Sequence, residues 1–185
     1  MKGIIQTVAN EITTVLSRVS EEEAVHLSEH LKSAKRIFVY GEGRSGLMGK
    51  AFAMRLMHGG FPVFVVGETV TPSIEADDLL VAITGSGSTG GILPFAEKAK
   101  QLGAKVFLVT TNRESKIAAI SDGVLVIPAA TKYRRPSEPE TIQPLGNQFD
   151  QSVHLVLDAI IIGTLQTENA ESTYAEMTKR HTNLE

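Results

Sequence analysis

Residues 37–46 read Ile37-Phe38-Val39-Tyr40-Gly41-Glu42-Gly43-Arg44-Ser45-Gly46, an apolar run that ends in a glycine-rich loop. The same arrangement returns 44 residues later, where Leu79-Leu80-Val81-Ala82-Ile83-Thr84 leads into Gly85-Ser86-Gly87-Ser88-Thr89-Gly90. Both loops have the form G-x-G-x-[ST]-G, and a run with helical character follows each of them. This duplication of strand, glycine loop and helix predicts an α/β fold and guides the interpretation of the remaining sequence.

Glycine-rich loops that open a helix are suited to binding anions. Glycine allows the backbone to approach a ligand closely, and the free N–H groups at the start of a helix, together with its dipole, favour negative charge. Hydroxyl and guanidinium groups inside both loops suit a phosphate group. We therefore predict that a phosphate-bearing ligand is bound by residues of these loops: Gly43, Arg44, Ser45, Gly46, Thr84, Gly85, Ser86, Gly87, Ser88 and Thr89.

The composition narrows the class of protein. Of the 185 residues, 42% are hydrophobic and 21% are charged, and the net charge is −3 without a basic run, so no nucleic acid partner is expected. Because cysteine is absent, disulfides and thiolate zinc sites are excluded. Polar residues interrupt residues 1–15, unlike a signal peptide, and the apolar stretch 155–165 is too short to cross a bilayer. We expect a cytoplasmic protein with no membrane partner.

Strand-like and helix-like runs alternate along the chain. Apolar spacing predicts a helix over residues 3–19, and Ser20 with Glu23 forms a capping box for a second helix that reaches about Ala34. Helical stretches are expected near 46–58, 90–102, 114–121 and 146–166, with a short helical tail. Apolar, strand-like runs occupy residues 36–40, 61–66, 79–84, 105–110 and 124–128. Continuous apolar strands separated by helices indicate a parallel sheet that is covered on both faces.

The fold class that follows is a three-layer α/β sandwich with a five-stranded parallel sheet in the flavodoxin-like order 2-1-3-4-5. We expect a single domain over residues 1–185, in which N-terminal helices (1–34) pack on an α/β core (35–170) and a tail (171–185) follows. In this order the first and third strands are neighbours at the switch point, so the two glycine loops should face each other across one crevice at the carboxyl edge of the sheet.

A dinucleotide site is the competing interpretation of the first loop. Residues 41–46 also fit the Rossmann pattern G-x-G-x-x-G, and Glu68 follows the second strand where a ribose-binding acid would lie. The second, hydroxyl-rich loop argues against it, because a Rossmann fold has no second fingerprint after its third strand. We expect no nicotinamide or other cofactor and no metal.

Several segments resemble a known family. The loops GEGRSG and TGSGSTG look like the phosphosugar-binding loops of the sugar isomerase (SIS) fold. The resemblance extends over residues 2–185 and is closest to the 6-phospho-3-hexuloisomerase family. It is carried by GEGRSG together with FAMRLMHGGFPVFVVGETVTPS (52–73), PLGNQFDQS (144–152) and KRHTNLE (179–185).

This resemblance implies a specific activity. Members of the family interconvert D-arabino-hex-3-ulose 6-phosphate and D-fructose 6-phosphate through an enediolate, without a cofactor. The resemblance further implies a place in the ribulose monophosphate pathway, in formaldehyde fixation or detoxification, functional coupling to 3-hexulose-6-phosphate synthase, and a homotetramer. A non-catalytic phosphosugar-binding module and another isomerase, such as an arabinose 5-phosphate isomerase, are the alternatives.

A keto shift between adjacent carbons requires a general base, for which the loops and the last helix offer candidates. Asp150, at the start of the last helix, is the predicted base, although the family more often has glutamate there. His181 in the tail and His58 at a helix end are further catalytic candidates, with His181 acting in its own or a neighbouring subunit. Glu42, Glu68 and Glu75 are weaker ones.

Two other segments bear on the site or on assembly. The cluster Lys132-Tyr133-Arg134-Arg135 lies in a proline-rich segment, and its charges could cover the phosphate or only face solvent. The first helix carries an apolar stripe that would be buried most naturally between subunits, which predicts a homo-oligomer. The stripe comprises Ile4, Ile5, Val8, Ile12 and Val15.

Overall fold

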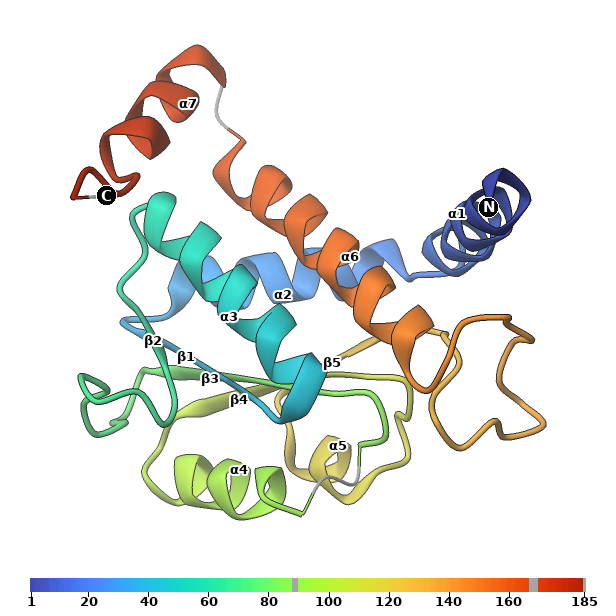
Figure 1. The fold of residues 1–185 in the computed structure, drawn as a ribbon. Coiled ribbons are helices and arrows are strands. Elements are labelled where there is room, and N and C mark those ends of the chain that lie inside the picture. The colour runs from blue at the N-terminus through green and yellow to red at the C-terminus, as the bar shows by residue number, and fades with distance from the viewer. Residues whose placement is uncertain (88–89, 167–169, 185) are drawn as a thin grey trace.

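A three-layer α/β sandwich is formed by the chain in the computed structural model, which describes residues 1–87, 90–166 and 170–184 (Figure 1). The middle layer is one sheet of parallel strands in the order β2-β1-β3-β4-β5. The predicted fold class and strand order are confirmed. The strands are β1 (Ile37–Gly41), β2 (Val63–Val65), β3 (Leu79–Thr84), β4 (Lys105–Thr110) and β5 (Gly123–Val126).

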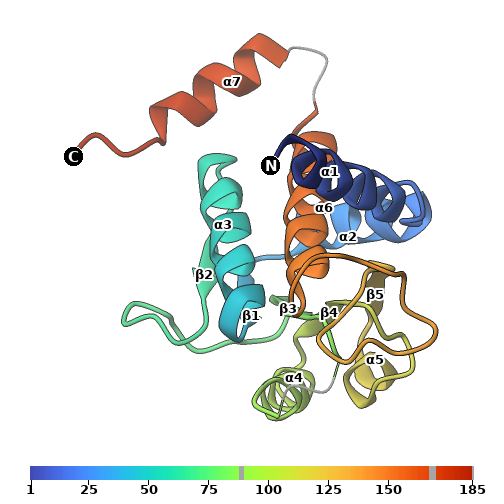
Figure 2. The ribbon, with the colours of Figure 1, turned by 45° about the vertical axis from the view of Figure 1, so that its right-hand side comes forward.

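Helices cover both faces of the sheet. Three of them, α2, α3 and α6, pack on one face, and α4 and α5 pack on the other (Figures 1 and 2). The helices are α1 (Lys2–Leu16), α2 (Glu21–Ser33), α3 (Gly43–His58), α4 (Ile92–Gln101), α5 (Lys116–Ile120), α6 (Asn147–Leu165) and α7 (Ala170–Lys179).

Strand β3 shows why the strands read as unbroken apolar runs. Its alternate residues Leu79, Val81 and Ile83 pack toward α2, α3 and α6, whereas Leu80 and Ala82 pack toward α4. All six residues of β3 are buried, because a parallel strand with helices on both faces has no solvent-facing side.

Helix boundaries follow local chemistry. The hydroxyl of Ser20 accepts a hydrogen bond from the Glu23 N–H at 3.3 Å, as the capping box predicts. Helix α3 begins at Gly43, three residues earlier than predicted, so the first glycine loop itself forms the first helical turn. Helix α4 begins at Ile92, later than predicted, with Pro94 in its first turn, where the missing N–H costs no helical hydrogen bond.

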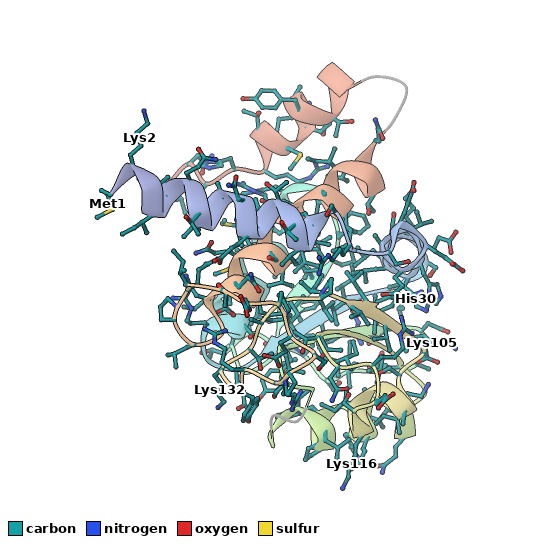
Figure 3. The ribbon with its side chains drawn as sticks, turned by 90° about the vertical axis from the view of Figure 1, so that its right-hand side faces the viewer. Met1, Lys2, His30, Lys105, Lys116 and Lys132 are labelled. Atoms are coloured by element: carbon teal, nitrogen blue, oxygen red, sulfur yellow. The ribbon has the colours of Figure 1, made fainter. Side chains whose placement is uncertain are left out.

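The two end helices lie apart from the sheet. Figure 3 shows Met1 and Lys2 on the end of α1 that projects from the body, and Lys132 on the loop beneath this helix. Near the projecting end, Ile4 and Ile5 are exposed, whereas Ile12 and Val15 are buried. Helix α7 leads to Arg180, whose Nη1 donates to the His58 carbonyl at 3.3 Å. None of the helices that the structure describes combines the length and apolarity needed to cross a membrane.

Candidate active site

The two glycine loops lie beside each other at the carboxyl edge of the sheet. Strands β1 and β3 pair in parallel with Gly41 opposite Ile83, so the two strands end at the same level of the sheet. They border a pocket of about 380 Å³ that the segment after β5 and the start of α6 complete. Its lining residues are Glu42, Gly43, Arg44, Ser45, Ile83, Thr84, Gly85, Ser86, Thr131, Lys132, Tyr133, Leu145, Gly146, Phe149 and Asp150.

The first loop depends on glycine for its close packing. A Cβ on Gly46 would lie 2.5 Å from the carbonyl oxygen of Gly41, and a Cβ on Gly41 would lie 2.9 Å from the carbonyl oxygen of Ile83. Both obstacles are backbone atoms that cannot turn aside. The absence of these side chains allows the first turn of α3 to pack against the end of β1, which places Arg44 and Ser45 at the pocket.

The second loop is held between β4 and α5. Gly87 has φ +67°, and a Cβ there would lie 2.6 Å from the Cβ of Ser115. Thr111 anchors the start of the loop, because its N–H and its hydroxyl both donate to the Gly85 carbonyl, at 3.2 and 2.7 Å. The predicted phosphate ligands Ser88 and Thr89 lie outside the described residues.

Asp150 presents its carboxylate to this pocket from the first turn of α6. The residue is only 4% exposed, and both carboxylate oxygens accept hydrogen bonds from the first glycine loop. Arg44 Nε donates to Oδ2 at 2.8 Å, and Ser45 Oγ lies 3.5 Å from Oδ1. The structure thus brings the predicted base together with two predicted phosphate ligands.

Arg44 joins the loop to α6 through two side chains. Its Nε donates to Asp150, and its Nη2 donates to Asn147 Oδ1 at 2.5 Å. These bonds use two of the five N–H donors of a guanidinium, and the side chain is 59% exposed. Arg44 can therefore hold Asp150 and an oxygen of a bound anion at the same time.

The segment between β5 and α6 forms one wall of the pocket. It contributes Thr131, Lys132 and Tyr133, of which the Lys132 ammonium lies 5.2 Å from the centre of the Tyr133 ring. Glu138 fixes the start of this wall, accepting bonds from the Thr131 N–H at 2.8 Å and hydroxyl at 2.6 Å. The sequence left open whether the basic residues 132–135 cover the phosphate or face solvent. Lys132 lines the pocket, whereas Arg134 donates to the Thr131 carbonyl and the Gln143 carbonyl.

His58 and His181 lie together, but not at this pocket of the same chain. Their rings stack with centroids 5.3 Å apart, at the end of α3 opposite to Ser45. A helix of this length spans roughly 24 Å, which separates the pair from Asp150. Burial lowers the pKa of His58, and the neighbouring charges of Arg55 and His181 lower it further. A catalytic role for either histidine thus stays a prediction that requires another subunit.

The other carboxylates proposed from the sequence have local partners. Glu42 lines the pocket and accepts a bond from the Tyr40 hydroxyl at 3.3 Å, while burial and then the Glu42 charge raise the pKa of that phenol. Glu68 pairs with Lys50 at 2.5 Å, and Glu75 pairs with Arg36 at 3.3 Å. The described part of the chain holds no cluster of three or more histidine and carboxylate side chains that could bind a metal.

A larger cavity, of about 1120 Å³, lies between α2 and α5, away from the glycine loops. Its acidic lining would repel a phosphate group, so we place the candidate site at the smaller pocket. The acidic residues that line the larger cavity are Glu21, Glu22, Glu23, Glu29, Glu114 and Asp122.

Three contributors to the site escaped the sequence analysis. Asn147 bonds Arg44, Thr131 lines the wall, and the Phe149 ring packs within 3.1 Å of the position a Cβ would take on Gly85. Asn147 could have been found, because it lies three residues before Asp150 and therefore on the same side of the first helical turn. Thr131 lies in a segment without periodicity, which gave no signal.

Comparisons with known proteins identify the family to which the chain belongs. The SIS domain model matches residues 30–139. The 3-hexulose-6-phosphate isomerase of Bacillus subtilis (strain 168) is 39% identical over 181 residues, covering 98% of this chain and 97% of the relative. The protein of the same name from Mycobacterium gastri is 38% identical over 181 residues, covering 98% and 89%.

A solved structure extends the similarity to three dimensions. It is the crystal structure of a hypothetical protein from Methanococcus jannaschii, for which a molecular function of 3-hexulose-6-phosphate isomerase was inferred from that structure. It matches with a TM-score of 0.81 at 32% identity and covers 97% of this chain and 98% of its own. The chain belongs to the SIS domain family, and within it to the group that contains the 3-hexulose-6-phosphate isomerases.

Proposed function

We propose that this chain is a 3-hexulose-6-phosphate isomerase, which interconverts D-arabino-hex-3-ulose 6-phosphate and D-fructose 6-phosphate. One observation carries the proposal: a buried carboxylate, Asp150, lines the same pocket as the two glycine loops. A phosphosugar isomerase needs this combination, because the phosphate must be held while a base reaches the carbon chain. Relatives of this name match over almost the whole chain.

In the proposed reaction Asp150 acts as the general base. Its carboxylate removes the proton from C2 of the 3-ketose, which leaves a 2,3-enediolate. The protonated carboxyl group then returns a proton to C3. The proton of the C2 hydroxyl passes to the C3 oxygen, so the C2 oxygen becomes the new carbonyl and the C3 oxygen becomes a hydroxyl. With both transfers the proton count balances within the substrate, and the carbon-bound transfer requires a base that can also act as an acid.

The phosphate group is assigned to the two loops. Arg44 and Ser45 supply a guanidinium and a hydroxyl from the first loop, next to the backbone N–H groups that open α3. The second loop contributes the backbone and hydroxyl of Ser86, and Ser88 and Thr89 are retained as ligands. Lys132 adds a positive charge at the wall of the pocket. The remaining predicted ligands are Gly43, Gly46, Thr84, Gly85 and Gly87.

The proposal also covers the setting in which the enzyme works. We assign residues 1–185 to one SIS domain that assembles as a homotetramer in the cytoplasm. His58 and His181 would act at the pocket of a neighbouring subunit. The 3-hexulose-6-phosphate synthase would supply the substrate, which places the enzyme in the ribulose monophosphate pathway and in formaldehyde detoxification.

Purified protein incubated with D-arabino-hex-3-ulose 6-phosphate tests the proposal directly. Fructose 6-phosphate should form, and in deuterium oxide it should carry deuterium on carbon, because the proton on the base exchanges with solvent during the lifetime of the enediolate. A parallel reaction with arabinose 5-phosphate, followed as ribulose 5-phosphate, should be much slower. Turnover of the pentose phosphate alone would assign the chain to the other isomerase class, and binding of both without turnover would make it a phosphosugar-binding module.

A further inference from the structure

A carboxylate on the first helix holds the segment that leads into the active site. Glu11 of α1 accepts three hydrogen bonds from residues more than 100 positions away. They come from the Thr141 hydroxyl at 2.5 Å, the Ile142 N–H at 2.9 Å and the Gln143 side-chain amide at 2.9 Å. Gln143 itself is buried, with 2% exposure.

The bonds continue from Gln143 to the proposed base. Asn147 donates from Nδ2 to Gln143 Oε1 at 3.1 Å, and its Oδ1 accepts the bond from Arg44 Nη2 at 2.5 Å. Arg44 then donates to Asp150 at 2.8 Å. An unbroken path of side chains thus runs from α1 into the pocket.

The two ends of this path determine the orientation of the amides between them. A glutamate carboxylate can only accept hydrogen bonds, and a guanidinium can only donate them. Gln143 must therefore turn its NH₂ group toward Glu11, and Asn147 must turn its oxygen toward Arg44. Both amide dipoles point the same way, so the bonds reinforce one another.

We propose that Glu11 is a positioning residue for the isomerase reaction, acting on Arg44 and Asp150 through Gln143 and Asn147. This inference rests on the proposed function, because it assigns Asp150 as the group that must be placed. It gives the first helix, which does not border the pocket, a part in catalysis.

The segment needs such support because its backbone is unfavourable at two points. Arg134 has φ +48° and Leu145 has φ +52°, in the left-handed backbone region that residues other than glycine rarely adopt. Contacts from outside the segment must hold it there. Burial alone would raise the pKa of Glu11, but the bonds from Thr141, Ile142 and Gln143 outweigh it, so the pKa is lowered. The carboxylate is thus ionised and engaged at neutral pH.

A double-mutant cycle separates positioning from simple stabilisation of the helix. Glu11→Gln keeps the size of the side chain but replaces an acceptor oxygen by a donor. We expect kcat to fall about tenfold with thermal stability nearly retained, since small displacements of a catalytic group are costly. Asn147→Ala cuts the path in its middle. In that background Glu11→Gln should lower kcat less than twofold further, because the two residues act in series. Asn10→Ala, on the exposed side of α1, serves as the control with wild-type kcat.

Multiplied losses in the double variant, or an unchanged kcat in Glu11→Gln, would overturn the proposal. A second measurement needs no substrate: the exchange of the Arg44 Nε–H with water, followed by NMR. Exchange should be faster in Glu11→Gln than in wild type, because the hold on Arg44 is loosened, and equal rates would reject the path. If wild-type protein fails to turn over the hexulose phosphate, the proposed function fails while the exchange result still decides whether Glu11 positions Arg44.

Discussion

Arg44 Nε lies 2.8 Å from Asp150 Oδ2, so the first glycine loop and the last long helix meet in one ion pair across 106 positions of sequence. The pair couples the predicted phosphate ligand to the predicted base. A substrate whose phosphate engages Arg44 is therefore brought within reach of the carboxylate, which is the geometric condition for a rapid proton transfer.

Asp150→Asn tests the base. The amide keeps the size and much of the hydrogen bonding but cannot accept a proton at neutral pH, so kcat should fall by about 10²–10⁴ with KM little changed. Steady-state kinetics and deuterium incorporation into the product measure this, and Asp150→Glu should retain substantial activity. Asp158→Asn, a partly exposed aspartate of the same helix, is the matched control. A loss of only a few-fold would move the role to His181 of a neighbouring subunit, then to His58.

Ser45→Ala and Ser86→Ala test the phosphate loops. Each change removes one hydrogen bond to a charged group, worth roughly 1.5–3 kcal/mol, so KM should rise about ten- to a hundredfold. Because the phosphate is bound alike in substrate and transition state, kcat should change less. Ser33→Ala, at an exposed helix end, should leave both constants unaltered. A double variant with wild-type KM would show that the phosphate binds elsewhere.

Gly46→Ala tests the packing of α3 against β1. The added methyl group would lie 2.5 Å from a backbone oxygen, so the free energy of unfolding should fall by about 1–3 kcal/mol and substrate affinity should drop with it. Gly163→Ala in α6 is the control, since nothing beyond its chain neighbours and the backbone of its own helix lies within 4 Å of its Cβ position. That variant should be as stable as wild type or up to about 1 kcal/mol more stable in urea denaturation.

Assembly can be measured by light scattering. We expect a particle of about four times the chain mass of 19.9 kDa. Ile4→Glu with Ile5→Glu places charges on the exposed apolar side of α1 and should yield smaller species, while Gln6→Glu on the opposite side should not. A monomeric wild-type protein at micromolar concentration would contradict the prediction and remove any role for histidines of a neighbouring subunit.

The pH dependence of stability should reflect His58. Burial, then Arg55 and His181, lower its pKa in the folded state below the ordinary value of about 6.5. Between these two pKa values the unfolded chain binds more protons than the folded chain. The contribution of His58 to the free energy of unfolding is therefore fully present above about pH 6.5 and declines as pH falls toward the folded pKa. His58→Gln should flatten this decline in denaturation experiments, and NMR titration of the ring should show a midpoint below 6.5. A midpoint at or above 6.5 would show that the pKa of His58 is not lowered in the folded state.

The fold could be predicted from local sequence to a large extent. Five apolar runs with helices between most of them indicate a parallel sheet, and the repeated glycine loop indicates which strand ends meet. The start of α3 was misplaced because a glycine-rich loop and a first helical turn look alike in sequence. Gly43, with its φ of +56°, belongs to that turn.

The predicted residues that line the pocket lie in first helical turns or where β3 ends and its glycine loop begins. Asp150 and Ser45 stand in first helical turns, whose position follows from the strand order. The wall that carries Lys132 comes from a segment without periodicity, and its path is set by Glu11 and Glu138, contacts that no local pattern encodes. His58 was predicted to act at the site because its neighbours in sequence resemble those of the family. Helix α3 places it at the end opposite to the pocket of the same chain.

The long separation between Arg44 and Asp150 has a consequence for folding. Both glycine loops precede α6 in the chain, so a nascent polypeptide can form the sheet as far as β5 while its pocket still lacks one wall and the carboxylate. Contacts of such high sequence separation form slowly, because the intervening loop must first be closed. Recovery of activity after dilution from denaturant therefore reports the docking of α6, whereas the return of secondary structure reports an earlier event.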